Sequence, residues 1–207
     1  MKALTIITIL LTVVTASSYF QFEQPLKTNI DGIEKQFKSK QFKLKSKIYV
    51  SDDFFPDAGS FDLEQPLVYI RMDKEFHVQP EVKYYFTPDD TIRLISHSWD
   101  TKSVSKNLNY NEDFSKSKEQ DINQWNAKFD QLQGQISTSL GASIEGNGEL
   151  ETKSRSGYGD WKERNIKWKS NGCTTELKMV WTEQDIQLSG GPRLVPTFRI
   201  RTKTYWN

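Results

Sequence analysis

Histidine and cysteine are the scarcest chemically active groups in this sequence, so their positions decide which reactions need to be considered. The chain contains His77, His97 and Cys173 and no other residue of either type. A zinc site is usually built on a pair of ligands a few residues apart, and these three residues include no such pair. A Cys173–His97 nucleophile pair is no better supported, because the preceding Asn171-Gly172 is typical of a hairpin turn that leads into a strand. The sequence therefore predicts no metal site, no cofactor and a buried, unreactive thiol.

Acidic residues are abundant but form no recognisable catalytic pattern. Asp52, Asp53 and Asp57 lie close together, yet their spacing does not match a calcium loop, and turn formation is the ordinary role of aspartates in such a segment. The sequence has no Gly-x-Ser-x-Gly motif and no phosphate-binding loop. Because the two carboxylates of a glycoside hydrolase meet only in three dimensions, a hydrolase with carboxylates scattered in the sequence stays open as the alternative function.

Tryptophan is the enriched residue type, with six in 207 residues. Trp125, Trp168 and Trp181 fall on the apolar faces of predicted elements and are expected in the core, whereas the other three lie at strand ends beside polar residues. Exposed aromatic rings on a sheet can stack on sugars or anchor a protein partner. We therefore predict a ligand-binding surface on the solvated face of a sheet, formed by His97, Trp99, Trp161, Arg199 and Tyr205. The competing interpretation is that a chain without disulfides uses these aromatics to build its core.

One helix and several strands must position these residues. Apolar side chains between residues 119 and 140 recur every three or four positions and predict one amphipathic helix, which Gly141 can end. Ile30, Ile33 and Phe37 predict a short N-terminal helix behind Asn29. Alternating patterns predict strands over 43–50, 67–72, 82–86, 91–99, 161–169, 174–181 and 197–206.

The connections complete the predicted fold. Turns are expected at residues 87–90 and 170–172, and a further turn is expected between Pro192 and Pro196. Long polar loops are expected over residues 100–116 and 142–159. Strands in runs joined by hairpins indicate an α+β fold, with a mostly antiparallel sheet packed on the long helix. Residues 17–207 are expected to form this single domain.

The first sixteen residues predict the compartment. Lys2, a short apolar run and Val14-Thr15-Ala16 are typical of a secretory signal peptide cleaved after Ala16. The apolar run is shorter than a membrane span, so no stable membrane anchor is expected after cleavage. Without Lys2 the chain has 27 basic and 27 acidic residues, a balance that argues against bulk nucleic-acid binding. The sequence thus predicts an exported, periplasmic or extracellular, non-enzymatic domain that binds a protein partner or a glycan.

Overall fold

In the described part of the chain, eight strands form one antiparallel sheet in the order β1-β2-β3-β4-β8-β7-β6-β5. The computed structural model describes all residues except 1–18, 102–113, 156–158, 171, 189–190 and 207. The strands are β1 (Lys40–Phe42), β2 (Leu67–Ile70), β3 (Glu81–Phe86), β4 (Ile92–Asp100), β5 (Glu151–Arg155), β6 (Gly159–Ser170), β7 (Cys173–Leu188) and β8 (Gly191–Trp206). The predicted mostly antiparallel sheet is therefore confirmed. The predicted signal peptide and most of the predicted loop 100–116 lie outside the described residues.

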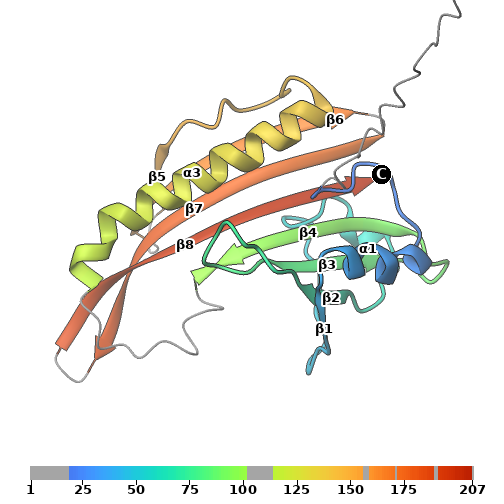
Figure 1. The fold of residues 1–207 in the computed structure, drawn as a ribbon, viewed down its shortest axis with the longest axis horizontal. Coiled ribbons are helices and arrows are strands. Elements are labelled where there is room, and N and C mark those ends of the chain that lie inside the picture. The colour runs from blue at the N-terminus through green and yellow to red at the C-terminus, as the bar shows by residue number, and fades with distance from the viewer. Residues whose placement is uncertain (1–18, 102–113, 156–158, 171, 189–190, 207) are drawn as a thin grey trace, which may run out of the picture.

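Two helices lie on one face of this sheet, which we call the helix face. Figure 1 shows α3 (Phe114–Leu140) along the β6–β8 half and α1 (Ile30–Gln36) over the β2–β4 half. Short 3-10 turns precede α1 (Lys27–Asn29) and lie within the long β1–β2 connection (Ala58–Ser60). The helix α3 ends at Gly141, whose φ of 83° and hydrogen bond to the Ser137 carbonyl form the left-handed end expected of glycine.

The core lies between the helices and the helix face. Buried side chains of α3 pack on buried side chains of β6–β8, namely Trp125, Phe129, Leu132 and Ile136 on Ile166, Trp168, Leu177, Met179 and Ile200. Ile30 of α1 packs in a second cluster with Tyr69, Val82, Tyr84 and Ile95. Cys173 belongs to that second cluster and is 1% exposed, so the buried thiol predicted from the sequence is confirmed.

The opposite face of the sheet is covered only in part by the described residues, and we call it the open face. The segment 48–63 folds over β3, β4 and the end of β8, where Phe55 and Ala58 are buried against Tyr85, Leu94 and Tyr205. Beyond that segment, alternation along the strands places the side chains of Lys178, Val180, Arg199 and Arg201 on the open face. Lys178 and Arg199 are 47% and 42% exposed there, and the ring of Phe54 reaches Arg201 from the segment 48–63.

Three sequence predictions fail at the polar edges of the fold. Residues 43–50 form no strand; β1 precedes them, although Ile48 and Val50 do pack inward. The predicted loop 142–159 contains β5, an edge strand whose polar residues gave no alternating signal. The segment predicted as a turn between Pro192 and Pro196 is part of β8. Both prolines lie outside residues 199–205, the stretch of β8 that pairs with β4. The backbone N–H group that proline lacks is therefore not needed for a hydrogen bond to β4.

Candidate functional site

The five residues predicted as one binding surface lie on two different faces. His97 and Trp99 point to the helix face, where they are 1% and 0% exposed. Arg199 and Tyr205 alternate with Ile200 and Thr204 on β8 and point to the open face, as does Trp161 on β6. The structure therefore does not bring the five residues together. The prediction failed because alternation along a strand groups residues by face but does not reveal which face the helices cover.

His97 is enclosed by aromatic rings and by the neighbouring strand. Its ring centroid lies 5.8 Å from that of Tyr19 and 5.2 Å from that of Phe20, and its Nδ1 is 3.1 Å from the Thr202 hydroxyl. Its Nε2 has no hydrogen-bond partner among the described residues. Burial, with a smaller contribution from the Arg71 charge, holds the pKa of His97 well below its usual value. A neutral histidine sealed in the core has no access to a ligand.

Trp99 has a structural contact that explains its burial. Its indole Nε1 donates to Asp73 Oδ2 at 3.2 Å, and Lys128 of α3 lies 2.7 Å from the same oxygen. Asp73 thereby links β4, the β2–β3 connection and α3 inside the core. Trp99, near the end of β4, thus helps to attach α3 to the sheet through Asp73.

The other three predicted residues are on the open face but are not equally accessible. Tyr205 is 3% exposed, because Phe55 of the segment 48–63 packs on it, and its hydroxyl donates to Glu176 at 3.0 Å. Trp161 is half-buried and its indole donates to Glu163 at 3.0 Å. Arg199 remains 42% exposed. Trp161 and Arg199 thus remain as candidates for ligand contact.

Three surface pockets allow a comparison of possible sites. The first, which we call the helix groove, has a volume of about 600 Å³ between the β2–β3 connection and α3; it is lined by Glu75, Phe76, His77, Gln124, Ala127, Lys128 and Gln131. Three of its polar groups already have partners, since Lys128 contacts Asp73 and donates to Gln131, and Gln131 donates to Glu75. A ligand there would have to displace these internal contacts.

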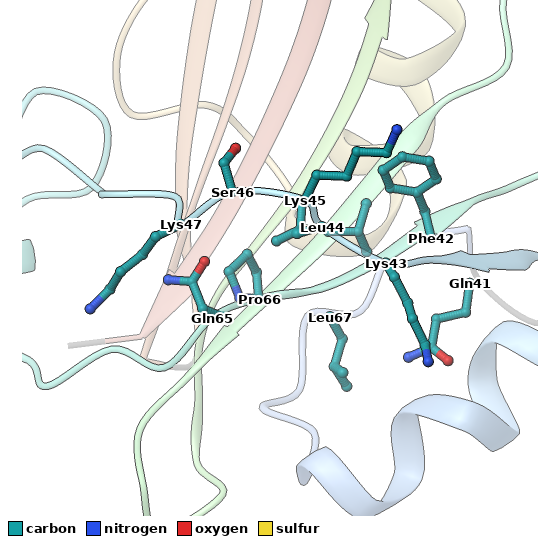
Figure 2. A pocket seen from close by; sticks show the side chains of 11 residues that line it. Gln41, Phe42, Lys43, Leu44, Lys45, Ser46, Lys47, Gln65, Pro66 and Leu67 are labelled. Atoms are coloured by element: carbon teal, nitrogen blue, oxygen red, sulfur yellow. The ribbon is translucent and has the colours of Figure 1, made fainter.

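The second pocket, which we call the lysine groove, lies at the β1–β2 edge of the sheet. It has a volume of about 530 Å³ and is lined by residues 41–47 and 65–68, including Lys43, Lys45 and Lys47. Figure 2 shows the three lysine side chains pointing in different directions. Because their charges do not converge, the groove lacks a focused anion site, and the lysines fit a solvated edge that resists mispairing.

The third pocket, which we call the arginine pocket, is on the open face. It has a volume of about 250 Å³ and is lined by Asp53, Phe54, Glu176, Lys178, Val180, Arg199, Arg201 and Lys203. Strands β7 and β8 supply the floor, and the segment 48–63 supplies one wall through Phe54. Six of these eight residues are charged, so the pocket suits a polar or ionic group of a ligand.

Arg201 lies at the centre of the arginine pocket. Its neighbours across the sheet are Lys178 on β7 and Ser98 on β4, and its same-face neighbours along β8 are Arg199 and Lys203. Its guanidinium carbon lies 4.9 Å from the centroid of the Phe54 ring. No hydrogen bond or ion pair joins Arg201 to any residue in the described part of the chain. Burial and the nearby charge of Arg199 lower its pKa from the usual value.

The other charges of the arginine pocket have partners. Lys203 Nζ is 2.6 Å from Glu176 and donates to the Phe54 carbonyl at 2.9 Å. Lys178 is 2.8 Å from Glu163. Arg199 Nε lies 3.6 Å from Asp100, a longer and weaker contact. Arg201 is therefore the cation of this pocket that has no described carboxylate in direct contact, although Asp100 and Glu81 stabilise its charge from beyond ion-pair distance.

Sequence reasoning missed Phe54, Lys178 and Arg201 as site residues. The alternation of β8 already grouped Arg201 with Arg199 on one side of the strand, which was the signal available. Nothing in the sequence indicated that Phe54 would lie over β8, since the contact joins residues almost 150 positions apart.

Two carboxylates in or beside the arginine pocket are engaged in internal contacts. Within the arginine pocket Glu176 accepts hydrogen bonds or ion pairs from Tyr205 and Lys203. Burial would raise the pKa of the adjacent Glu163, but hydrogen bonds from Lys178 and Trp161 outweigh it and lower that pKa. A general acid needs a raised pKa, so Glu163 is not suited to that role. Among the described residues no group of three or more His, Cys, Asp or Glu side chains is arranged to hold a metal ion.

Comparison of the chain with protein-family models, curated proteins and solved structures gives no significant match. In the described part of the chain, no helix is both long and apolar enough to cross a membrane.

Proposed function

We propose that this protein is a binding module that holds a protein partner or a glycan on the open face of its sheet. The observation that carries the proposal is the asymmetry between the two faces. The helix face is occupied by α1, α3 and the buried core, whereas the segment 48–63 covers the β8 end of the open face and leaves Lys178 and Arg199 47% and 42% exposed. The β6–β8 part of the open face carries both the arginine pocket and the half-buried ring of Trp161.

The composition of the open face indicates how the ligand is held. Trp161 and Val180 are its described apolar contacts beyond the segment 48–63, and most of the remaining side chains are charged. Binding then rests on a small number of hydrogen-bonded or ionic contacts with one aromatic platform beside them. A ligand with a large apolar surface would find little to cover here.

Screening of the purified protein on arrays of glycans and extended peptides tests the proposal. A ligand found in this way is then measured with the variants Trp161→Ala and Tyr49→Ala. Both substitutions remove an aromatic ring, but Trp161 belongs to β6, whereas Tyr49 is 82% exposed in the β1–β2 connection. The proposal predicts a loss of affinity of about tenfold or more for Trp161→Ala and no change for Tyr49→Ala. Equal affinity of both variants and the wild-type protein would contradict the proposal.

We further propose that the protein works outside the cytoplasm, on the basis of residues 1–16. N-terminal sequencing of the protein purified from its native cells tests this directly. A sequence beginning at Ser17 supports export, and a protein that begins at Met1 contradicts it.

A further inference from the structure

We propose that the arginine pocket binds a carboxylate group of the ligand, with Arg201 as its principal contact. This inference rests on the proposed function and adds the chemistry of the group recognised. It is carried by three features of the pocket: the arrangement of charges around Arg201, the aromatic ring beside it, and the size of the cavity.

The charges around Arg201 disfavour the ligand-free state of the pocket. Of its four nearest same-face neighbours on the sheet, three are cations (Lys178, Arg199 and Lys203) and the fourth is Ser98. Like charges in neighbouring positions of a sheet repel one another. The two lysines have carboxylate partners in direct contact, namely Glu163 and Glu176, whereas no described carboxylate contacts Arg201, on which Asp100 and Glu81 act only from a longer distance. An anion placed beside Arg201 would offset this repulsion.

The charge count favours a singly charged group. Lys178 and Lys203 are paired at 2.8 and 2.6 Å, and Arg199 has a longer contact to Asp100. One guanidinium is thus left without a counter-charge in contact. A carboxylate balances that single charge, and its two oxygens match the parallel N–H donors of a guanidinium. A phosphate dianion would bring a second negative charge near Asp53 and Glu176, which also line the cavity.

The ring of Phe54 shapes the pocket for this contact. Arg201 lies over the ring at 4.9 Å, so the ring restricts the guanidinium on one side and shields it from water. A cavity of about 250 Å³ is small for a whole ligand but large enough for an acidic group and the few atoms that carry it. The remainder of the ligand would extend over the open face toward Trp161.

Titration of the ¹⁵N-labelled protein with small carboxylates tests the inference. Glucuronate represents an acidic sugar and N-acetylglutamate α-amide an acidic side chain. Glucose and N-acetylglutamine α-amide are their neutral counterparts, and all titrations are made at the same ionic strength. We expect a saturable shift of the Arg201 Nε–H signal with at least one carboxylate and none with either neutral counterpart. A stronger response to glucuronate identifies an acidic glycan, and a stronger response to the glutamate amide identifies an acidic protein segment.

Substitutions establish whether Arg201 carries the contact. In the variant Arg201→Gln, followed through backbone amides of β7 and β8, the saturable response should be lost, and in Arg201→Lys it should weaken at least severalfold. The matched control is Arg93→Gln, since Arg93 is also half-buried over a phenylalanine, 5.1 Å from the Phe61 ring, but does not line the pocket. Arg93→Gln should keep the wild-type response.

Three results would overturn the inference: no saturable response of the wild-type protein to any carboxylate, an unchanged response in Arg201→Gln, or tighter binding of inorganic phosphate than of either carboxylate. A different result would contradict the proposed function. If an array ligand loses affinity in Trp161→Ala but not in Arg201→Gln, the open face is the binding surface and only the carboxylate inference is wrong. If neither substitution affects that ligand, the proposed function is wrong as well.

Discussion

At the scale of single residues, His97 combines complete burial with an ionisable ring. The folded state holds the pKa of His97 well below 6.5, whereas the unfolded chain has a histidine of ordinary pKa. As the pH falls below about 6.5, the unfolded state therefore binds a proton that the folded state does not. Because the unfolded state binds more protons, the free energy of unfolding falls as the pH is lowered.

We predict that this single group destabilises the protein by up to about 2 kcal/mol between pH 7 and pH 5. Urea denaturation at a series of pH values measures the effect. His97→Gln should flatten the pH dependence over this interval. His77→Gln should keep it, because His77 is exposed. A wild-type slope that persists in His97→Gln would show that another group is responsible.

At the scale of elements, α1 is attached to the sheet by a buried ion pair. Glu34 of α1 and Arg71, just after β2, are 2% and 0% exposed, and Arg71 Nη2 lies 2.6 Å from Glu34 Oε1. The Tyr84 hydroxyl also donates to this carboxylate, and Arg71 donates to the Tyr19 carbonyl at 2.7 Å. Such a pair adds little net stability over an apolar pair, but removing one partner leaves an uncompensated buried charge.

Glu34→Gln should therefore destabilise the protein by about 3 to 5 kcal/mol in urea denaturation. The control is Glu151→Gln, since Glu151 is 58% exposed in its ion pair with Lys153 and its loss should leave the midpoint unchanged. A second measurement uses the double variant Glu34→Gln with Arg71→Met, which should recover part of the lost stability because the unpaired charge is gone. A double variant less stable than Glu34→Gln alone would contradict this explanation.

The exit of α3 is fixed to β6 by a close backbone approach at Gly146. This residue has a φ of 72°, and a Cβ atom there would lie 2.2 Å from the Asn165 carbonyl oxygen. Gly172 has a similar φ of 77°, but a Cβ atom added to it would meet no other heavy atom within 4 Å. Substitution of Gly172 therefore tests backbone strain alone, whereas substitution of Gly146 adds a steric overlap with Asn165.

We predict that Gly172→Ala costs about 1 to 2 kcal/mol through backbone strain alone. Gly146→Ala should cost about 2 to 5 kcal/mol, because β6 must also move. Thermal or urea denaturation of the two variants makes the comparison. Equal losses of stability would mean that the approach of Gly146 to Asn165 relaxes without cost.

The same scale explains which parts of the fold the sequence could predict. The alternation of β8 correctly separated Ile200 and Trp206 from Arg199 and Arg201, because each face of a strand has its own environment. The alternation of β4 correctly placed His97 and Trp99 on one face of that strand. The local pattern could not reveal that Tyr19, Phe20 and α3 cover that face, since those contacts come from distant segments. Strands β1 and β5 were missed because polar edge strands lack an apolar face.

At the scale of the whole molecule, the helix face carries most of the core, and the open face is where we propose that the ligand binds. The twist and length of β7 and β8 extend the sheet beyond α3, with residues 183–188 and 191–196 paired to each other (Figure 1). The helix face supplies the core that a chain with a single cysteine needs for stability. The open face can then carry unpaired charge at Arg201 without endangering the fold.

Binding of an anion to the open face should also raise the stability of the entire protein. At ten times its dissociation constant, a ligand that binds only the folded state adds about 1.4 kcal/mol to the free energy of unfolding. We predict a higher melting temperature in sodium glucuronate, or in the glutamate amide, than in sodium chloride of equal ionic strength. Arg201→Gln should show no such difference, and Arg93→Gln should show the wild-type difference. An equal rise in the melting temperature of Arg201→Gln would contradict the prediction and show that the rise is a general salt effect.

Mapping of amide chemical shifts on titration with a small carboxylate shows whether the ligand binds at the arginine pocket, because it locates binding even when the natural ligand is unidentified. We predict that the largest saturable shifts fall at 176–180 of β7 and 198–203 of β8, together with the indole N–H of Trp161. Shifts concentrated at 41–47 and 65–68, which line the lysine groove, would contradict this prediction and place the binding surface at the edge of the sheet.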